Sequence, residues 1–170
     1  MIFLANRRNL QLRRLHRERI ANRFESDNLF TDVTFSRASR RSPGPYRVAA
    51  KTDARLFLDD ASYPTSEARI EVGFDRVGTS ERDQYWINWV EPKRSLLVGW
   101  HQDDTHPEFG DVHLQVSDAD TTVEHLSAEF IDSHPLDVLS HRLSQLPKTV
   151  QAVQWANNRP TGFDLGSESE

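Results

Sequence analysis

The sequence predicts an α+β fold, with an antiparallel β-sheet of about five or six strands, a basic N-terminal helix and a C-terminal amphipathic helix on one face. Stretches in the middle of the chain alternate apolar and polar residues, as half-buried strands do. Their connections are too short to hold crossover helices, so neighbouring strands should run antiparallel. Segments near the two ends have the apolar spacing of helices instead.

The N-terminal segment, residues 1–24, favours a basic helix. Residues 6–24 contain neither glycine nor proline, and Leu12, Leu15 and Ile20 lie on an arginine-rich background. We expect this helix to pack edge-on against the domain with its arginines in water, because a charged helical face is usually solvated. An arm that docks nucleic acid or a partner protein is the alternative.

The middle of the chain is predicted to form consecutive strands. A loop rich in serine, proline and glycine is expected at residues 37–45. The segments QYWINWV and SLLVGW flank EPKR, in which Pro92 suits the second position of a type I turn, so they should form a hairpin. Strands are expected at residues 30–36, 46–51 and 68–74, in the two arms of this hairpin, and at 112–116.

The C-terminal third is predicted to contain a strand, a helix and a tail. Residues 121–132 fit a strand or a helix, and we favour the strand. Residues 133–146 predict a helix with Ser133 as N-cap, and Pro147 should end or kink it, with a last turn or two reaching Trp155. Its apolar face consists of leucines at positions 136, 139, 143 and 146. Residues 28–155 would form a single domain, followed by a flexible acidic tail at 156–170.

The charge of the chain is unevenly distributed. The formal net charge is −5, with +6 in residues 1 to 23 and −11 in the remainder. The acidic body argues against broad non-specific binding of nucleic acid. Nucleic acid could still bind at the basic N-terminal segment or at a local arginine cluster. Only three lysines occur, with no cysteine and many aspartates. This composition suits the cytoplasm of a halophilic archaeon, and a GC-rich genome produces part of the same bias.

Several function classes are excluded or disfavoured by composition. The absence of cysteine excludes disulfides and thiolate metal sites. No apolar stretch is long enough to cross a bilayer, and the arginines after the opening residues do not suit a secretory signal. We therefore expect a cytoplasmic protein without a membrane partner.

The segment GWHQDDTHPEFGDVHLQ, residues 99–115, carries the densest set of groups suited to catalysis. Strand parity places His101 and His113 on the face opposite the core, and His125 joins them if its segment is a strand. Converging imidazoles suit general acid–base chemistry, with carboxylates such as Asp103 and Glu108 to orient them. The spacing matches no zinc signature such as HExxH, so we expect no metal and no other cofactor. The alternative to a catalytic site is a solvated polar turn without a chemical role.

A family resemblance supports the catalytic interpretation. The hairpin YWINWVEPKRSLLVGW, its final Trp100, and His106, Pro107 and Glu108 at a matching distance resemble the TumE-like toxins of toxin–antitoxin pairs in archaea and bacteria. His113 corresponds to what remains of a downstream histidine pair of that family. The resemblance covers roughly residues 68–116 and extends toward the leucine-rich helix.

The sequence also departs from the pattern of that family. His101 and Gln102 stand where an acidic residue and an amide are expected, and Thr105 replaces a first histidine. The segment between Glu108 and His113 is shortened. Asp103 and Asp104 could supply the displaced carboxylate.

The resemblance implies a toxin that slows growth when its cognate antitoxin does not bind it. A metal-independent endoribonuclease is the preferred activity, because compact antiparallel-sheet toxins that act on RNA fit the histidine and arginine content. His106 would deprotonate the ribose 2′-hydroxyl and His113 would protonate the leaving oxygen. His101, Asp103 and Glu108 would complete the catalytic set, and Arg69, Arg94 and Trp100 would bind the substrate, with an arginine at the phosphate.

Two other functions remain open at this point. A non-enzymatic protein-binding module would use the aromatic hairpin, in which Trp86 and Trp89 have opposite parity, so that one of them could be exposed. A metal-dependent nuclease or phosphoesterase would use residues 103, 104, 106 and 113.

Overall fold

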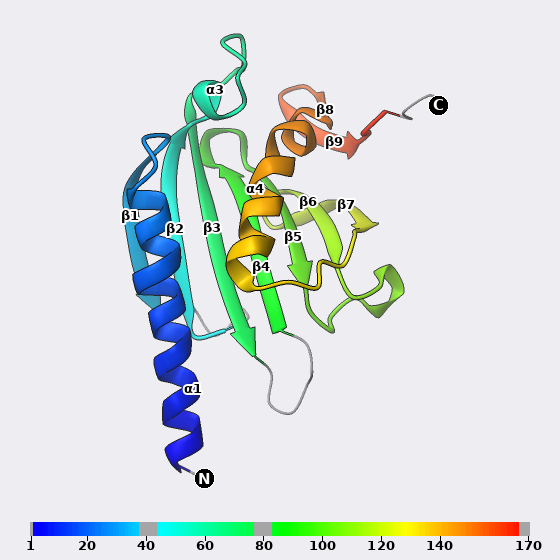
Figure 1. Ribbon diagram of the computed structural model, residues 1–170. Coiled ribbons are helices and arrows are strands. Elements are labelled where there is room, and N and C mark those ends of the chain that lie inside the picture. Colours follow the sequence, from blue (N-terminus) through cyan, green and yellow to red (C-terminus); the bar gives the residue numbers. More distant parts are fainter. Residues whose placement is uncertain (1, 38–43, 77–82, 167–170) are drawn as a thin grey trace.

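Seven strands form one antiparallel sheet, in which each strand pairs with its neighbours in sequence (Figure 1). The computed structural model describes residues 2–37, 44–76 and 83–166. The predicted α+β class is confirmed, with one strand more than the larger number expected. The strands are β1 (Phe30–Arg37), β2 (Tyr46–Asp53), β3 (Glu67–Arg76), β4 (Asp83–Glu91), β5 (Leu96–Gln102), β6 (His113–Asp118) and β7 (Thr121–Ser127).

Most connections between strands are short, as predicted, but residues 54–66 between β2 and β3 form a longer one. Of the loop expected at residues 37–45, residues 38–43 lie outside the described part of the chain. A short helix, α3 (Ala54–Phe57), follows β2, and a 3-10 turn, η2 (Pro92–Arg94), joins β4 to β5. A second 3-10 turn, η3 (Pro107–Phe109), lies between β5 and β6.

Helices at the two ends of the chain cover the same face of the sheet (Figure 1). The first is continuous through α1 (Ile2–Arg14), a π-helical segment η1 (Leu15–Ile20) and α2 (Ala21–Glu25). Its buried side chains include Leu12, Ile20 and Phe24, whereas most of its arginines are exposed. The predicted basic helix packed with its arginines in water is therefore confirmed.

A buried histidine links this helix to the sheet through a hydrogen bond. His16 is 0 % exposed, and its Nδ1 lies 2.6 Å from the carbonyl oxygen of Leu12. Its Nε2 accepts a hydrogen bond of 3.0 Å from the backbone N–H of Phe74 in β3. Because an imidazole that accepts at Nε2 and donates at Nδ1 is neutral, this arrangement agrees with a pKa that burial lowers.

The second helix, α4 (Pro135–Gln151), packs across β4 and β5. Its N-cap is His134, whose Nδ1 accepts from the backbone N–H of Leu136 at 3.2 Å, so the predicted N-cap at Ser133 was wrong by one residue. Pro147 lies inside the helix and does not end it. The most buried residues of its apolar face include Leu139 and Leu146, each 0 % exposed.

The segment after α4 forms a hairpin where a flexible tail was expected. β8 (Val153–Ala156) pairs with β9 (Arg159–Phe163). Asn157 and Asn158 connect them with φ angles of 51° and 61°. Asparagine tolerates this left-handed conformation, which a two-residue hairpin turn of type I′ requires at both positions. The tail prediction overlooked this turn signal.

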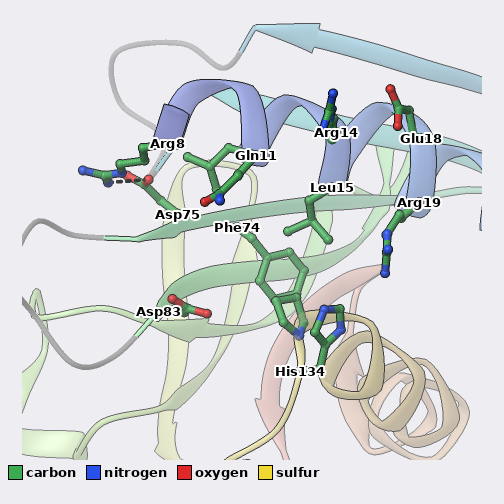
Figure 2. A pocket seen from close by; sticks show the side chains of 12 residues that line it. Arg8, Gln11, Arg14, Leu15, Glu18, Arg19, Phe74, Asp75, Asp83 and His134 are labelled. Atoms are coloured by element: carbon green, nitrogen blue, oxygen red, sulfur yellow. Dashed lines mark hydrogen bonds and ion pairs between the residues drawn. The ribbon is translucent and has the colours of Figure 1, made fainter. Parts of the chain in front are cut away.

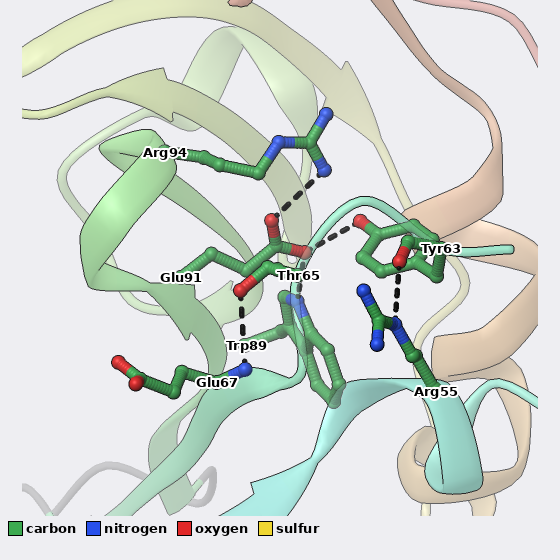
Figure 3. Close-up of polar contacts among 7 residues, drawn as sticks. All are labelled: Arg55, Tyr63, Thr65, Glu67, Trp89, Glu91 and Arg94. Carbon is green, nitrogen blue, oxygen red and sulfur yellow. Dashed lines mark hydrogen bonds and ion pairs between the residues drawn. The ribbon is translucent and has the colours of Figure 1, made fainter. Parts of the chain in front are cut away.

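A buried carboxylate joins the end of β4 to the loop after α3 (Figure 3). Glu91 is 0 % exposed and accepts hydrogen bonds from the hydroxyl of Tyr63 at 2.5 Å and Nε1 of Trp89 at 2.8 Å. Arg94 completes the network, with its guanidinium 3.1 Å from Glu91 and 3.5 Å from the centre of a Trp155 ring in β8. The network therefore holds the C-terminal hairpin against the sheet.

Candidate active site: a histidine cluster

Four imidazoles gather on the face of the sheet that the helices do not cover. Trp100 and Leu114 point into the core on the helix side, and by strand alternation their neighbours His101 and His113 point the other way. His101 and His113 are cross-strand partners, and their ring centres lie 5.3 Å apart. His125 in β7 reaches His113 diagonally at 5.1 Å. The convergence predicted from strand parity is confirmed.

The loop between β5 and β6 brings the fourth imidazole. The ring centre of His106 lies 4.4 Å from that of His125 and 5.1 Å from that of His113. Nδ1 of His106 lies 3.2 Å from Oε1 of Glu108, and 37 % of the His106 side chain is exposed. We define His101, His106, His113 and His125 as the histidine cluster. Of these four residues, only His113 is fully buried.

Three members of the cluster bring ring nitrogen atoms close together. One nitrogen of each of His106, His113 and His125 lies within 4.8 Å of the other two. His113 is 0 % exposed, yet neither of its ring nitrogens has a hydrogen-bond partner, and the same holds for Nε2 of His125. Buried polar atoms are nearly always partnered, and leaving one without a partner costs about 1–3 kcal/mol. This arrangement therefore needs a functional explanation.

Burial keeps the inner imidazoles uncharged near neutral pH. It lowers the pKa of His113 and of His125, and it lowers the pKa of His101 to about 4, with repulsion from His113 adding to the effect. Partial burial opposes ionisation of Asp103, but hydrogen bonds from Thr105 outweigh it and hold its pKa below the ordinary value. The cluster thus combines neutral imidazoles with an ionised carboxylate beside them.

Asn88, which the sequence analysis did not single out, supports the cluster from β4. Its Oδ1 lies 2.9 Å from Nε2 of His101. It reaches this position across Gly99, where a Cβ would lie 1.9 Å from Oδ1 of Asn88. Strand parity could have revealed the contact, because Asn88 pairs directly with Gly99, and His101, two residues further along β5, lies on the same face of the sheet. His125 was expected on this face but was not among the assigned catalytic residues.

The structure does not bring the predicted substrate-binding residues to the cluster. Arg69 lies on β3, where its Nε bonds Glu71 at 2.6 Å. Arg94 is held by Glu91 in the network of Figure 3. Trp100 is 4 % exposed and lies on the opposite face of the sheet, 5.1 Å from the guanidinium of Arg142. We therefore assign none of these three residues to substrate.

The aromatic hairpin offers no exposed tryptophan. Trp86 is 4 % exposed and Trp89 is 0 % exposed, so the parity argument for an exposed contact residue was wrong. Trp86 is covered although it faces away from Trp89, and its ring lies over Gly73 on the neighbouring strand. A docking role for this hairpin has no support from tryptophan exposure.

A separate groove of about 500 Å³ lies on the helix side of the sheet, between α1 and the start of α4 (Figure 2). Arg8 is already paired there with Asp75 at 2.7 Å. The charged side chains that line the groove are arginines 8, 14 and 19 and the carboxylates of residues 18, 75 and 83. This balance does not favour a phosphate backbone, so we place the candidate site at the histidine cluster.

Comparisons with known proteins leave this site without a family assignment. Within the described residues, no helix combines the length and the apolar character needed to span a membrane. No protein-family model matches the chain, and neither the curated proteins nor the solved structures yield a significant match. The resemblance to TumE-like toxins therefore depends on the quoted residues and stays a prediction.

Proposed function

We propose that the histidine cluster is the active site of a phosphodiesterase that cleaves RNA, and that the chain is the toxin of a cytoplasmic toxin–antitoxin pair. The catalytic part depends on one observation: His101, His113 and His125 from three consecutive strands converge with His106 from a loop. Such convergence of titratable groups is typical of catalytic centres. The RNA substrate and the antitoxin partner follow from the family resemblance.

His106 is the member of the cluster best placed to meet a substrate. It is more exposed than His113, and the carboxylate of Glu108 beside it can orient its ring. In this scheme a ring nitrogen of His106 takes the proton of the ribose 2′-hydroxyl, the 2′-oxygen attacks phosphorus, and the bond from phosphorus to the 5′-oxygen breaks. The leaving oxygen takes a proton from water or from a neighbouring acid.

His113 is unsuited to the acid role suggested by sequence. Its side chain is fully buried, so it cannot touch a leaving group, and burial lowers its pKa and thereby its protonated fraction. Neutral, inward-facing imidazoles are better metal ligands than acids. A metal-dependent phosphodiesterase at the same site is therefore the second candidate, with a metal-bound water in place of the histidine acid.

The test is induction of the wild type and of His106→Ala in growing cells, with total RNA examined at the same times. His141→Ala is the matched control, because His141 lies on α4 outside the cluster and 48 % of its side chain is exposed. We expect growth arrest with RNA cleavage in the wild type and in the control but not in His106→Ala. Normal growth with intact RNA in the wild type would refute the toxin proposal. Undiminished cleavage by His106→Ala would refute the site.

A further inference from the structure

We infer that His106, His113 and His125 bind one divalent transition-metal ion, and that Zn²⁺ fits this site best. The role of the ion in RNA cleavage depends on the proposed function, but binding itself depends only on the geometry of these side chains. The inference replaces the sequence-based expectation of a site without metal.

The distances between the ligand atoms suit a single ion. Zinc bonds histidine nitrogen at about 2.0–2.1 Å, so two nitrogens at a tetrahedral angle lie about 3.4 Å apart. The three nitrogens here lie within 4.8 Å of one another. Closing this triangle around an ion requires shifts of about 1 Å or less per side chain. Ring rotations and the loop that carries His106 can supply such movements.

The fold supplies two ligands from the sheet and one from a loop. His113 and His125 are set by the register of β6 and β7. His106 precedes η3, a turn that packs against β7. Because 37 % of the His106 side chain is exposed, we infer that the fourth coordination position is open to solvent, as it is in catalytic zinc sites with three protein ligands.

The nitrogens without partners point independently to a ligand. Both ring nitrogens of His113 are buried without a hydrogen-bond partner, and Nε2 of His125 is in the same condition. An ion bound by one nitrogen of each ring would give one of the two nitrogens of His113 a partner. His16 shows the usual alternative in the same protein, since both nitrogens of this fully buried histidine have partners.

A second group of possible ligands competes for His113. His101, Asp103 and His113 also place one atom each within 4.8 Å of one another. We favour the three imidazoles because the Asp103 carboxylate already accepts hydrogen bonds from the backbone N–H and the hydroxyl of Thr105. Nε2 of His101 is also engaged with Asn88. In our assignment Asp103 contributes charge near the ion without binding it.

The donor set selects the class of metal. Three imidazole nitrogens suit zinc, copper, nickel or iron, whereas Mg²⁺ and Ca²⁺ prefer oxygen ligands. The site should therefore bind Zn²⁺ and Co²⁺ and ignore Mg²⁺ in excess.

Titration calorimetry of the metal-free full-length protein with ZnCl₂ tests the inference, and Co²⁺ absorption reports tetrahedral geometry. We expect one Zn²⁺ per chain. His106→Gln and His125→Gln should each weaken binding more than about 100-fold, which exceeds the loss from removing an outer-shell partner. His141→Gln should bind like the wild type, and Asp103→Asn should lose about 10-fold at most. Circular dichroism of each variant confirms that it is folded, and His106 lies in a loop that tolerates exchange.

The possible results separate the metal site from the proposed function. Failure of the wild type to bind Zn²⁺ would refute it outright. Full binding by His106→Gln together with loss of binding by Asp103→Asn would show that the second group, His101, Asp103 and His113, binds the ion instead. RNA cleavage in excess chelator by a protein that does not bind Zn²⁺ would refute the metal and leave the proposed function standing. Zn²⁺ binding without RNA cleavage would support the metal site and refute the proposed function.

Discussion

His101 and His113 face each other directly across β5 and β6, and their rings meet edge to face with centres 5.3 Å apart. His113 is fully buried, and burial together with repulsion from His113 lowers the pKa of His101 to about 4. His101 has a partner in Asn88, but both buried nitrogens of His113 lack one, which is costly to stability. The pair is therefore better explained by function, and the following predictions separate function from stability.

Replacing His113 by leucine should not destabilise the metal-free protein. The substitution removes two buried nitrogens without partners and keeps a side chain of similar size, so the free energy of unfolding should stay equal or rise by about 1–3 kcal/mol. The same variant should no longer be stabilised by Zn²⁺. Urea unfolding with and without Zn²⁺ measures both effects.

His16→Leu is the matched control, because His16 is equally buried but has partners at both nitrogens. It should lose about 1–3 kcal/mol, since the backbone N–H of Phe74 is left without its acceptor. A loss of similar size in His113→Leu would show that His113 is an ordinary structural residue.

The stability of the metal-free protein should fall as the pH is lowered. His16 has a folded pKa below its unfolded value of about 6.5, so between these two values the unfolded chain binds a proton that the folded protein does not. Stability is therefore lost as the pH falls through this window. His16→Leu should reduce the slope by up to about 1.4 kcal/mol per pH unit. Urea midpoints from pH 8 to pH 5 provide the comparison, and an unchanged slope would contradict the prediction.

The buried carboxylate of Glu91 should be essential to stability and irrelevant to metal binding. Glu91→Ala leaves the guanidinium of Arg94, only 8 % exposed, without its charged partner, which costs about 3–5 kcal/mol. Glu91→Leu combined with Arg94→Met should cost less than Glu91→Ala, because no isolated charge remains. A double-mutant cycle in urea, with Zn²⁺ affinity measured on each folded variant, tests both statements. Additive losses would count against a coupled network.

Gly99→Ala should damage the fold and leave the metal site largely intact. The added Cβ would lie 1.9 Å from Oδ1 of Asn88 and 2.6 Å from the backbone oxygen of Ile87, and overpacking of this kind costs about 1–3 kcal/mol. Displacing Asn88 from His101 should change the Zn²⁺ affinity by less than about 10-fold, because His101 is not a ligand in our assignment. Gly162→Ala in β9 is the control, because its nearest neighbour is the flexible end of Gln154 at 3.0 Å. Equal melting temperatures for the two variants would refute the close contact.

Much of the fold could be predicted because its signals are local. Alternation in residues 68–74 and 112–116 placed core and outer faces correctly, and short connections required antiparallel neighbours. The N-cap of α4 and the hairpin of β8 and β9 were missed. The N-cap is His134 although the adjacent Ser133 is the residue type that N-caps prefer, and the turn signal of Asn157 and Asn158 was overlooked.

The sequence by itself determined the α+β class, the basic helix and the face on which His101, His113 and His125 lie, because strand periodicity depends only on neighbouring residues. Only the tertiary structure decided that His106 returns to meet them, that Arg94 is engaged with Glu91, and that His113 is buried without a partner. These facts depend on how a loop closes over the sheet and on which groups exclude water. Both are set by packing between distant segments, for which local sequence patterns carry no signal.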